Sequence, residues 1–281
     1  MDKNINVKSE IKSFSGVQGV YSHYSETCNC EMTFGLYLPE ISKFSKVPTI
    51  WYLSGLTCTH ENAMLKAGIQ FWANQKGLAV IFPDTSPRGA TVPDNDAFDL
   101  GQGAGFYVNA TQSPWSQNYQ MWDYVVTELP SLISANFSLD LSRQSIMGHS
   151  MGGHGALTMA FDSETEFLSV SAFSPICSPS TTEWGIKQLT HYLGDDQEKW
   201  KKHDASLALR DTKFSGPILI DVGTKDEFWD LLSPTSFIDA ATNNRKEISF
   251  RLQKGYDHSY FFVSSFIPDH VNFHAKTLLS R

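Results

Sequence analysis

Short apolar runs alternate with longer amphipathic stretches along this chain. Residues 32–39 alternate apolar and polar side chains, as expected of a strand with one buried face. Residues 49–55 and 78–84 are mostly apolar and end in Gly or Pro-Asp, which is typical of central strands buried on both faces. Between them, residues 61–77 predict a helix that stops at Gly77.

The second half of the chain continues this alternation. Residues 118–137 predict a helix with a kink at Pro130, and the stretch from Tyr260 to Leu279 predicts a largely helical segment that Pro268 interrupts. The remaining candidates are four short strands and one helix: strands at residues 144–150, 167–175, 217–223 and 248–253, and a helix at residues 152–161. This order indicates an α/β fold with a mostly parallel central sheet and helices on both faces.

One long connection departs from the regular pattern. Residues 84–117 are rich in Pro, Gly and Asp and predict a loop. Loops of this length are uncommon in compact domains and are usually functional. The sequence contains no internal repeat, low-complexity tract or linker. We therefore predict a single domain over residues 1–281.

Composition and charge restrict the class of protein. Hydrophobic residues make up 41% of the chain, enough for a sizeable core, and 30 acidic against 22 basic side chains give a formal charge of −8. Without a Lys/Arg cluster, this balance argues against nucleic acid or an anionic membrane as a partner. The first residues lack the apolar core of a signal peptide, and no run approaches ~18 consecutive apolar residues. A soluble cytoplasmic protein is the expectation.

The strongest chemical signal is the sequence Gly148-His149-Ser150-Met151-Gly152, which has the pattern G-x-S-x-G. An apolar strand precedes it and a glycine-rich helix start follows it. The serine is therefore expected on a sharp strand-to-helix turn, with its hydroxyl presented above the sheet. This context predicts an α/β-hydrolase fold with Ser150 as the nucleophile.

A serine hydroxyl needs a base within reach and a third group that orients the base. In this fold the order along the chain is Ser, then Asp or Glu, then His. His258 lies in a loop after a late strand and is the candidate base. Asp221 lies inside the strand 217–223, whereas Asp226 lies on the loop after it, where active sites of α/β folds form. We prefer Asp226 as the acid and expect a structural or supporting role for Asp221.

The other histidines have simpler interpretations. His149 and His154 flank the serine turn and are expected to line the pocket or to pack. His270 and His274 are four residues apart in the terminal helix, and we predict that they form a solvated face rather than a metal site.

The four cysteines do not indicate a disulfide framework or a metal site. Cys28 and Cys30 have no second ligand pair in the sequence, so we interpret them as ordinary thiols and predict no metal and no cofactor. Cys58 is a conceivable rival nucleophile, because thiolates are reactive. Ser150 is better placed on its turn, which leaves Cys58 as a bystander that lines the pocket.

An oxyanion hole requires two backbone amides near the nucleophile. One is the amide after the serine, which belongs to Met151, and the other is expected on the loop after an earlier strand. The segment 54–59 leaves the strand that starts at residue 49 at the right place, and its candidate donor is the amide of Leu56. Each such donor contributes about 3–4 kcal/mol to transition-state stabilisation.

Several motifs longer than G-x-S-x-G resemble S-formylglutathione hydrolase, also called esterase D, over nearly the whole chain. They are SGLTCT (54–59), DTSPRG (84–89), GAGFYV (103–108), GHSMGGHGAL (148–157), SVSAFSPIC (169–177), YLG (192–194) and GYDHSYFF (255–262). The resemblance implies a cytosolic serine thioesterase that hydrolyses the small thioester S-formylglutathione to glutathione and formate in formaldehyde detoxification. It also implies activity on short-chain aryl esters and a homodimer.

The resemblance also implies roles for individual residues. Ser150, His258 and Asp226 match the nucleophile, the base and the acid, and Leu56 and Met151 match the two oxyanion positions.

Other matches concern the pocket. Cys58 matches a cysteine near the active site whose alkylation is expected to inhibit such enzymes, and Trp184 resembles a pocket-lining tryptophan. Trp184 and Phe228 are candidates for the walls of a narrow acyl pocket, and ordinary core packing is an equally weighted alternative.

The chain also departs from the family pattern. Val222 stands where the family often has Gln, Phe98 where it often has Trp, and residues 229–234 are about two residues shorter than usual. These differences lie near the acid loop and the mouth of the site. They bear on the recognition of glutathione and leave the three candidate catalytic residues intact.

Two other functions remain as alternatives. A broad short-chain carboxylesterase would use the same residues without needing glutathione. A binding module on a hydrolase fold would lack part of the Ser, His and Asp set, and the complete set argues against it.

Overall fold

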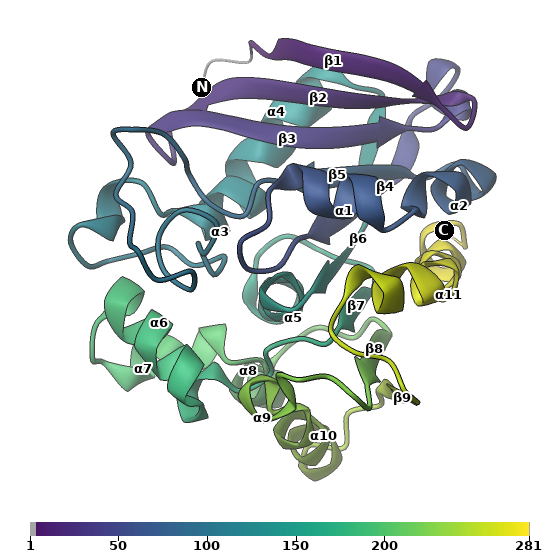
Figure 1. The fold of residues 1–281 in the computed structure, drawn as a ribbon. Helices are drawn as coiled ribbons and strands as arrows, with labels where there is room; N and C mark the ends of the chain where they lie inside the picture. Colours follow the sequence, from purple (N-terminus) through teal and green to yellow (C-terminus); the bar gives the residue numbers. More distant parts are fainter. Residues whose placement is uncertain (1–3, 281) are drawn as a thin grey trace.

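A single twisted sheet organises the protein. The computed structural model describes residues 4–280, and in this part of the chain nine strands form one sheet in the order β1-β2-β3-β5-β4-β6-β7-β8-β9 (Figure 1). The strands are β1 (Asn6–Ser13), β2 (Gly16–Ser25), β3 (Cys30–Leu38), β4 (Val47–Leu53), β5 (Ala79–Pro83), β6 (Leu139–His149), β7 (Val170–Phe173), β8 (Ile218–Gly223) and β9 (Ser249–Gln253).

The sheet is antiparallel at its N-terminal side and parallel elsewhere. β1, β2 and β3 pair as antiparallel neighbours, and β3 is also antiparallel to β5. From β5 through β4, β6, β7 and β8 to β9, every neighbouring pair is parallel. The predicted mostly parallel sheet is therefore confirmed. The parallel strands also end at a common side of the sheet, which fixes where their loops gather.

Helices cover both faces of the sheet. They are α1 (His60–Lys66), α2 (Ile69–Lys76), α3 (Met121–Asp123), α4 (Leu129–Asn136), α5 (Met151–Asp162), α6 (Glu183–Leu193), α7 (Gln197–Trp200), α8 (Ala205–Asp211), α9 (Trp229–Leu232), α10 (Pro234–Asn243) and α11 (Tyr260–Leu278). Short 3-10 turns are η1 (Glu40–Lys43), η2 (Trp115–Gln117), η4 (Pro179–Thr181) and η5 (Lys201–His203), and η3 (Tyr124–Glu128) is a π-helical turn. None of the helices among the described residues is long and apolar enough to cross a bilayer.

The central strands supply both hydrophobic cores because successive side chains point to opposite faces. In β4, Trp51 and Leu53 belong to the core beneath α4, α5, α8 and α10, whereas Ile50 and Tyr52 belong to the core beneath α1, α2 and α11. The C-terminal helix α11 lies beside α2 on that second face (Figure 1). β4, predicted as a strand buried on both faces, therefore contributes side chains to both cores.

The structure differs from the predicted elements at several places, and it contains the helices α6 to α10, which were not predicted. β1 and β2 were not predicted. β1 is an edge strand with mostly exposed side chains and gives a weak apolar pattern, whereas β2 is largely buried. The predicted helix 61–77 is two helices, since Gly68 takes a left-handed conformation (φ 69°) between α1 and α2. The predicted helix 118–137 begins at Met121 and contains the π-helical turn η3 just before Pro130.

The predicted interruption of the terminal helix was wrong. α11 runs from Tyr260 to Leu278 as one helix with Pro268 inside it. Apolar side chains on both sides of the proline, among them Ile267 and Val271, are buried in the same core. Packing of this continuous face compensates for the hydrogen bond that the proline cannot donate.

The predicted solvated face at His270 and His274 was also wrong. Both imidazoles are fully buried on the side of α11 that faces the sheet. His274 is hydrogen-bonded to the hydroxyls of Ser169 and Ser171, each at 2.8 Å, and His270 to that of Ser171, at 2.8 Å. Ser169, just before β7, and Ser171, within it, supply the polar partners that make burial of both imidazoles possible. The sequence alone does not show that these serines face the histidines.

The buried histidines generate a stability prediction. Burial is the main cause that lowers the pKa of a group of them: His149, His154, His203, His270 and His274. These rings stay neutral in the folded protein, whereas in the unfolded chain they take up protons below a pH of about 6.5. The free energy of unfolding should therefore fall as the pH drops from about 7 to about 5, by roughly 1.4 kcal/mol per pH unit for each extra proton bound by the unfolded chain.

Urea denaturation at several pH values measures this effect. The variant His154→Leu removes one titrating ring, whose pKa is lowered to about 4, and should reduce the drop in stability across that pH range. Equal stability of the natural chain at both ends of the range would contradict the assignment.

Candidate active site

The candidate catalytic residues all follow parallel strands at their carboxyl ends. Leu56 follows β4, Ser150 follows β6, Asp226 follows β8, and His258 lies between β9 and α11. Because these strands are parallel neighbours in the sheet, the loops after them gather at one side. The topology therefore brings together residues that are far apart in the sequence.

Ser150 occupies a strained turn between β6 and α5. Its backbone has φ 58° and ψ −120°, a conformation that non-glycine residues rarely adopt. Glycine is required on both sides: a Cβ at Gly148 would lie 2.1 Å from the carbonyl oxygen of Gly152, and one at Gly152 would lie 2.0 Å from that of Leu53. The amide of Ser150 donates to the carbonyl of Phe173 at the end of β7. The serine is thus fixed between two strands, as the G-x-S-x-G pattern predicts.

His258 is oriented by Asp226. The Nδ1 of His258 and the Oδ2 of Asp226 are 2.8 Å apart. Since Nδ1 is engaged by the carboxylate, Nε2 is the nitrogen that remains for chemistry in the pocket that both His258 and Ser150 line.

The Asp226 carboxylate is itself held in place. The Ser174 hydroxyl donates to its Oδ2 at 2.6 Å, and the amide of Phe228 donates to its Oδ1 at 3.0 Å. Burial acts to raise the pKa of Asp226, but these hydrogen bonds and the one to His258 hold this pKa below its usual value. The group is therefore a carboxylate at neutral pH. Ser174 was not singled out from the sequence, although its place directly after β7 is a usable signal.

Asp221 has a different environment. Its two carboxylate oxygens each accept a hydrogen bond of 2.6 Å from the guanidinium of Arg251, and Gln253 donates to Oδ2. Asp221 thus ties β8 to β9, which is the structural or supporting role expected of it from the sequence. The preference for Asp226 as the acid agrees with this arrangement.

The loop after β4 lies against Ser150. A Cβ at Gly55 would come within 3.2 Å of the Cβ of Ser150. Among the described residues, the amides of Leu56 and Met151 donate to no hydrogen-bond acceptor, and Met151 is the first residue of α5, where helical amides lack internal partners. Both candidate donors are therefore free amides, as an oxyanion hole requires.

A pocket of about 210 Å³ opens at this place. Its lining consists of Gly55, Leu56, Thr57, Cys58, Phe98, His149, Ser150, Trp184, Phe228, His258 and Tyr260. Trp184 and Phe228, predicted as walls, stack with ring centroids 5.4 Å apart, and Phe228 meets His258 at 4.9 Å. Phe98 extends the row outward, 5.9 Å from Trp184. Tyr260 was missed as a lining residue, although it lies in the GYDHSYFF motif.

His149 and Cys58 also line the pocket, and neither is suited to be the nucleophile or the base. The ring of His149 packs 4.6 Å from that of His258, and burial lowers its pKa to about 3, so a neutral ring faces the candidate base. Burial also raises the pKa of the Cys58 thiol, which keeps it protonated and weakly nucleophilic at neutral pH.

Neither a metal site nor a disulfide bridge is present among the described residues. No cluster of three or more His, Cys, Asp or Glu side chains there is arranged to hold an ion. All four cysteines are buried free thiols.

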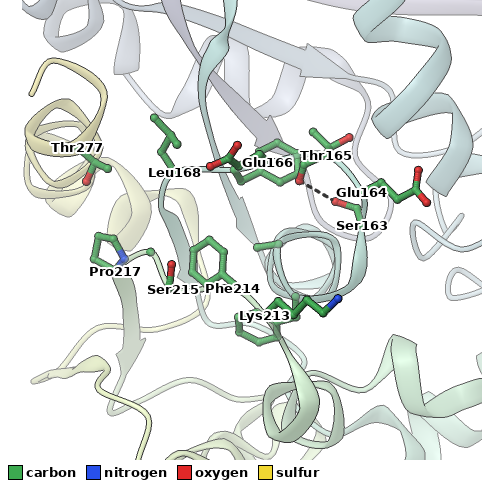
Figure 2. Close-up of a pocket in the computed structure, with 14 residues that line it drawn as sticks. Ser163, Glu164, Thr165, Glu166, Leu168, Lys213, Phe214, Ser215, Pro217 and Thr277 are labelled. Atoms are coloured by element: carbon green, nitrogen blue, oxygen red, sulfur yellow. Dashed lines mark hydrogen bonds between the residues drawn. The ribbon is translucent and has the colours of Figure 1, made fainter. Parts of the chain in front are cut away.

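A larger hollow of about 420 Å³ lies at the opposite end of the strands. It is lined by Leu168 and Pro217, which lie just before β7 and β8, and by the partly exposed segment 163–166 (Figure 2). A hydrogen bond of 3.2 Å from the Ser163 hydroxyl to the Thr165 carbonyl shapes that segment. None of the candidate catalytic residues contributes to this hollow.

Comparison with known proteins places the chain among esterases. The model of the putative esterase family matches residues 25–273. The S-formylglutathione hydrolase of Paracoccus denitrificans is 55% identical over 270 residues, which cover 96% of this chain and 97% of that protein. The S-formylglutathione hydrolase of Rattus norvegicus is 50% identical over 276 residues, with 96% and 97% covered. In structure, an S-formylglutathione hydrolase from Agrobacterium tumefaciens matches with a TM-score of 0.94 and 47% identity, covering 97% of this chain and 99% of that one.

The geometry predicts how single substitutions affect turnover. Ser150→Ala should abolish it with little change in thermal stability, because the side chain contributes little to packing. Asp226→Asn should slow turnover by up to ~10⁴-fold, since the amide favours the wrong tautomer of His258. Asp221→Asn should mainly lower the melting temperature, since it weakens the pairing with Arg251. Steady-state kinetics and thermal melts of the three variants test this, and a larger rate loss in Asp221→Asn than in Asp226→Asn would contradict the choice of acid.

Proposed function

The chain belongs to the S-formylglutathione hydrolase family, and from this premise we propose that it hydrolyses S-formylglutathione to glutathione and formate through a formyl-serine intermediate. The observation that carries the proposal is the 2.8 Å bond between His258 and Asp226 in the pocket that Ser150 also lines. An oriented base in the same pocket as a strained serine is the arrangement that acyl transfer requires.

The first half of the reaction forms the acyl-enzyme. His258 takes the proton of the Ser150 hydroxyl as the oxygen attacks the formyl carbon. The negative charge on the carbonyl oxygen is stabilised by the amides of Leu56 and Met151. When the tetrahedral intermediate collapses, the carbon–sulfur bond breaks and His258 returns the proton to the departing glutathione sulfur.

The second half releases formate. A water molecule loses a proton to His258 and attacks the formyl-serine carbon, and the same two amides hold the oxyanion. Collapse then breaks the ester bond, and His258 returns the proton to Ser150. The neutral His149 beside His258 supports this cycle, because a second positive charge would oppose protonation of the base.

The pocket fits a small acyl group. Its volume of about 210 Å³ and its aromatic walls, Trp184 and Phe228, favour a formyl or other short acyl chain over long ones. Of the positions that depart from the family pattern, Phe98 lines this pocket, whereas Val222 is buried within β8 and does not. The Phe98 position is therefore where a change in substrate recognition is expected.

The same walls suit flat aryl esters, which keeps a broad short-chain carboxylesterase as the second candidate function.

We further propose that the protein is a cytoplasmic homodimer, which the family resemblance supports. Sedimentation of the purified protein would test the dimer.

The specificity constant kcat/KM separates the two activities. We expect kcat/KM for S-formylglutathione to exceed that for 4-nitrophenyl acetate by at least about tenfold, which corresponds to about 1.4 kcal/mol of additional transition-state stabilisation. Comparable values for the two substrates would favour the carboxylesterase.

Labelling with a fluorophosphonate probe, with Ser150→Ala as the control, tests the nucleophile itself. An unlabelled natural chain would indicate a binding module.

The aromatic wall predicts a change in acyl selectivity. Trp184→Ala enlarges the pocket, so activity on 4-nitrophenyl butyrate should rise relative to 4-nitrophenyl acetate. Trp115→Phe, a conservative change at a buried tryptophan outside the pocket lining, serves as the control. An unchanged ratio in Trp184→Ala would show that Trp184 does not limit the acyl group.

A further inference from the structure

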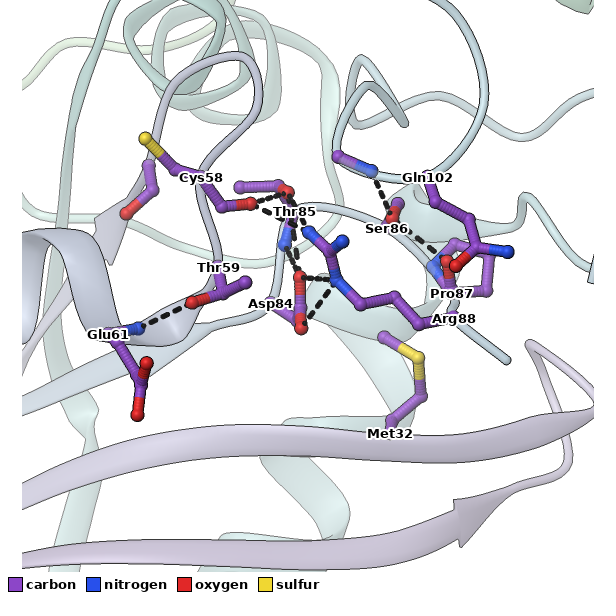
Figure 3. A network of polar contacts seen from close by, with 12 residues as sticks. Met32, Cys58, Thr59, Glu61, Asp84, Thr85, Ser86, Pro87, Arg88 and Gln102 are labelled. Carbon is purple, nitrogen blue, oxygen red and sulfur yellow. Dashed lines mark hydrogen bonds and ion pairs between the residues drawn. The ribbon is translucent and has the colours of Figure 1, made fainter. Parts of the chain in front are cut away.

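The segment after β5 contains an ion pair with a buried carboxylate that the reaction above does not use. Asp84 is only 4% exposed, and its carboxylate oxygens lie 3.0 and 3.1 Å from the Nε of Arg88 (Figure 3). The amide of Thr85 donates to the same carboxylate at 2.6 Å. These residues belong to the DTSPRG motif (84–89), for which sequence analysis found no chemical role.

Arg88 of this ion pair contacts the loop that follows β4. The Nη2 of Arg88 donates to the carbonyl oxygen of Cys58 at 2.8 Å, and the Thr85 hydroxyl donates to the same oxygen at 2.5 Å (Figure 3). A single carbonyl therefore receives two donors, one of which is charged and aligned by a buried carboxylate. Cys58 is two residues after Leu56, so this anchor lies next to the candidate oxyanion donor.

A second contact holds the same loop at Thr57, the residue directly after Leu56. The amide of Thr57 donates to the carbonyl of Gly103 at 2.9 Å, and the amide of Gly103 donates to the Ser86 hydroxyl at 2.8 Å. Thr57 has φ 64°, a left-handed conformation that costs a threonine about 1–2 kcal/mol and persists only where its surroundings impose it. The loop is thus held in an unfavourable backbone conformation from outside.

We propose that Arg88, aligned by Asp84 and assisted by Thr85, is a positioning residue that fixes the Leu56 amide at the site of the developing oxyanion. Arg88 does not itself line the pocket, and it acts through the carbonyl of Cys58, which does. The inference rests on the proposed function, in which the Leu56 amide stabilises the transition state. A donor that is not fixed in advance must reorganise during the reaction and loses part of its effect.

Two variants weaken the anchor in different ways. Thr85→Val removes one donor to the Cys58 carbonyl and leaves the Asp84–Arg88 pair intact, so it keeps the fold even if loss of Arg88 does not. Arg88→Met removes the charged donor, and Arg88→Lys restores the charge but not the planar, two-directional geometry. Arg143→Met is the matched control, because Arg143 pairs with Asp140 at 2.8 Å near the start of β6, at the other end of the strands.

The expected signature is a loss of kcat at nearly constant KM. Complete removal of one oxyanion donor costs about 10²–10³ in kcat, so a displaced donor in Arg88→Met should cost roughly 10–100-fold, Thr85→Val less, and Arg88→Lys an intermediate amount. The loss should be equal for S-formylglutathione and 4-nitrophenyl acetate, since both form the same oxyanion. Affinity for a trifluoromethyl ketone, which forms a tetrahedral adduct with the serine, should fall in parallel with kcat/KM.

Other outcomes would overturn the inference. Unchanged kcat in folded Thr85→Val and Arg88→Lys, with only a lowered melting temperature as in Arg143→Met, would mean that the ion pair is purely structural. A rise in KM without loss of kcat would point to substrate binding instead. The control Ser150→Ala separates this test from that of the proposed function: if it retains turnover, the serine mechanism itself fails, whatever the Arg88 variants do.

Discussion

The hydrogen bond between Asp226 and His258 is the contact on which the site depends. It joins the loop after β8 to the loop after β9, and it determines which imidazole nitrogen is left to face the pocket. Ser174, after β7, holds the same carboxylate, and Ser150, after β6, is tied through its amide to the end of β7. Neighbouring parallel strands thus position the candidate base, acid and nucleophile through contacts between their own loops. The rest of the sheet serves to keep these strand ends in register.

The oxyanion side of the site is organised in a different way. The loop after β4 has little regular structure, and one of its residues, Thr57, has a strained backbone. Its conformation is imposed by the segment after β5, through Arg88, Thr85 and the Gly103 carbonyl. The backbones of Ser150 and Thr57, both with positive φ, are therefore held by separate hydrogen-bond networks.

Much of this arrangement follows from sequence, because parallel strands, G-x-S-x-G and the order Ser, Asp, His are local patterns with strict geometric consequences. They predicted the sheet type and the residues that meet at its carboxyl ends. Features that depend on distant partners were not predicted. His270 and His274 look solvated until β7 supplies Ser169 and Ser171, and α11 remains continuous at Pro268 because both halves share one core. The role of Arg88 depends on a carbonyl 30 residues away, which no pattern within its own motif reveals.

The central claim is that Ser150 carries the acyl group during turnover. The most direct test is mass spectrometry of the protein quenched in acid during turnover of 4-nitrophenyl acetate, with Asp226→Asn used to slow deacylation. The account predicts one acetyl group per chain, located on Ser150 and absent from Ser150→Ala. Acetylation of Cys58 instead, or continued turnover with no acylated protein, would contradict it.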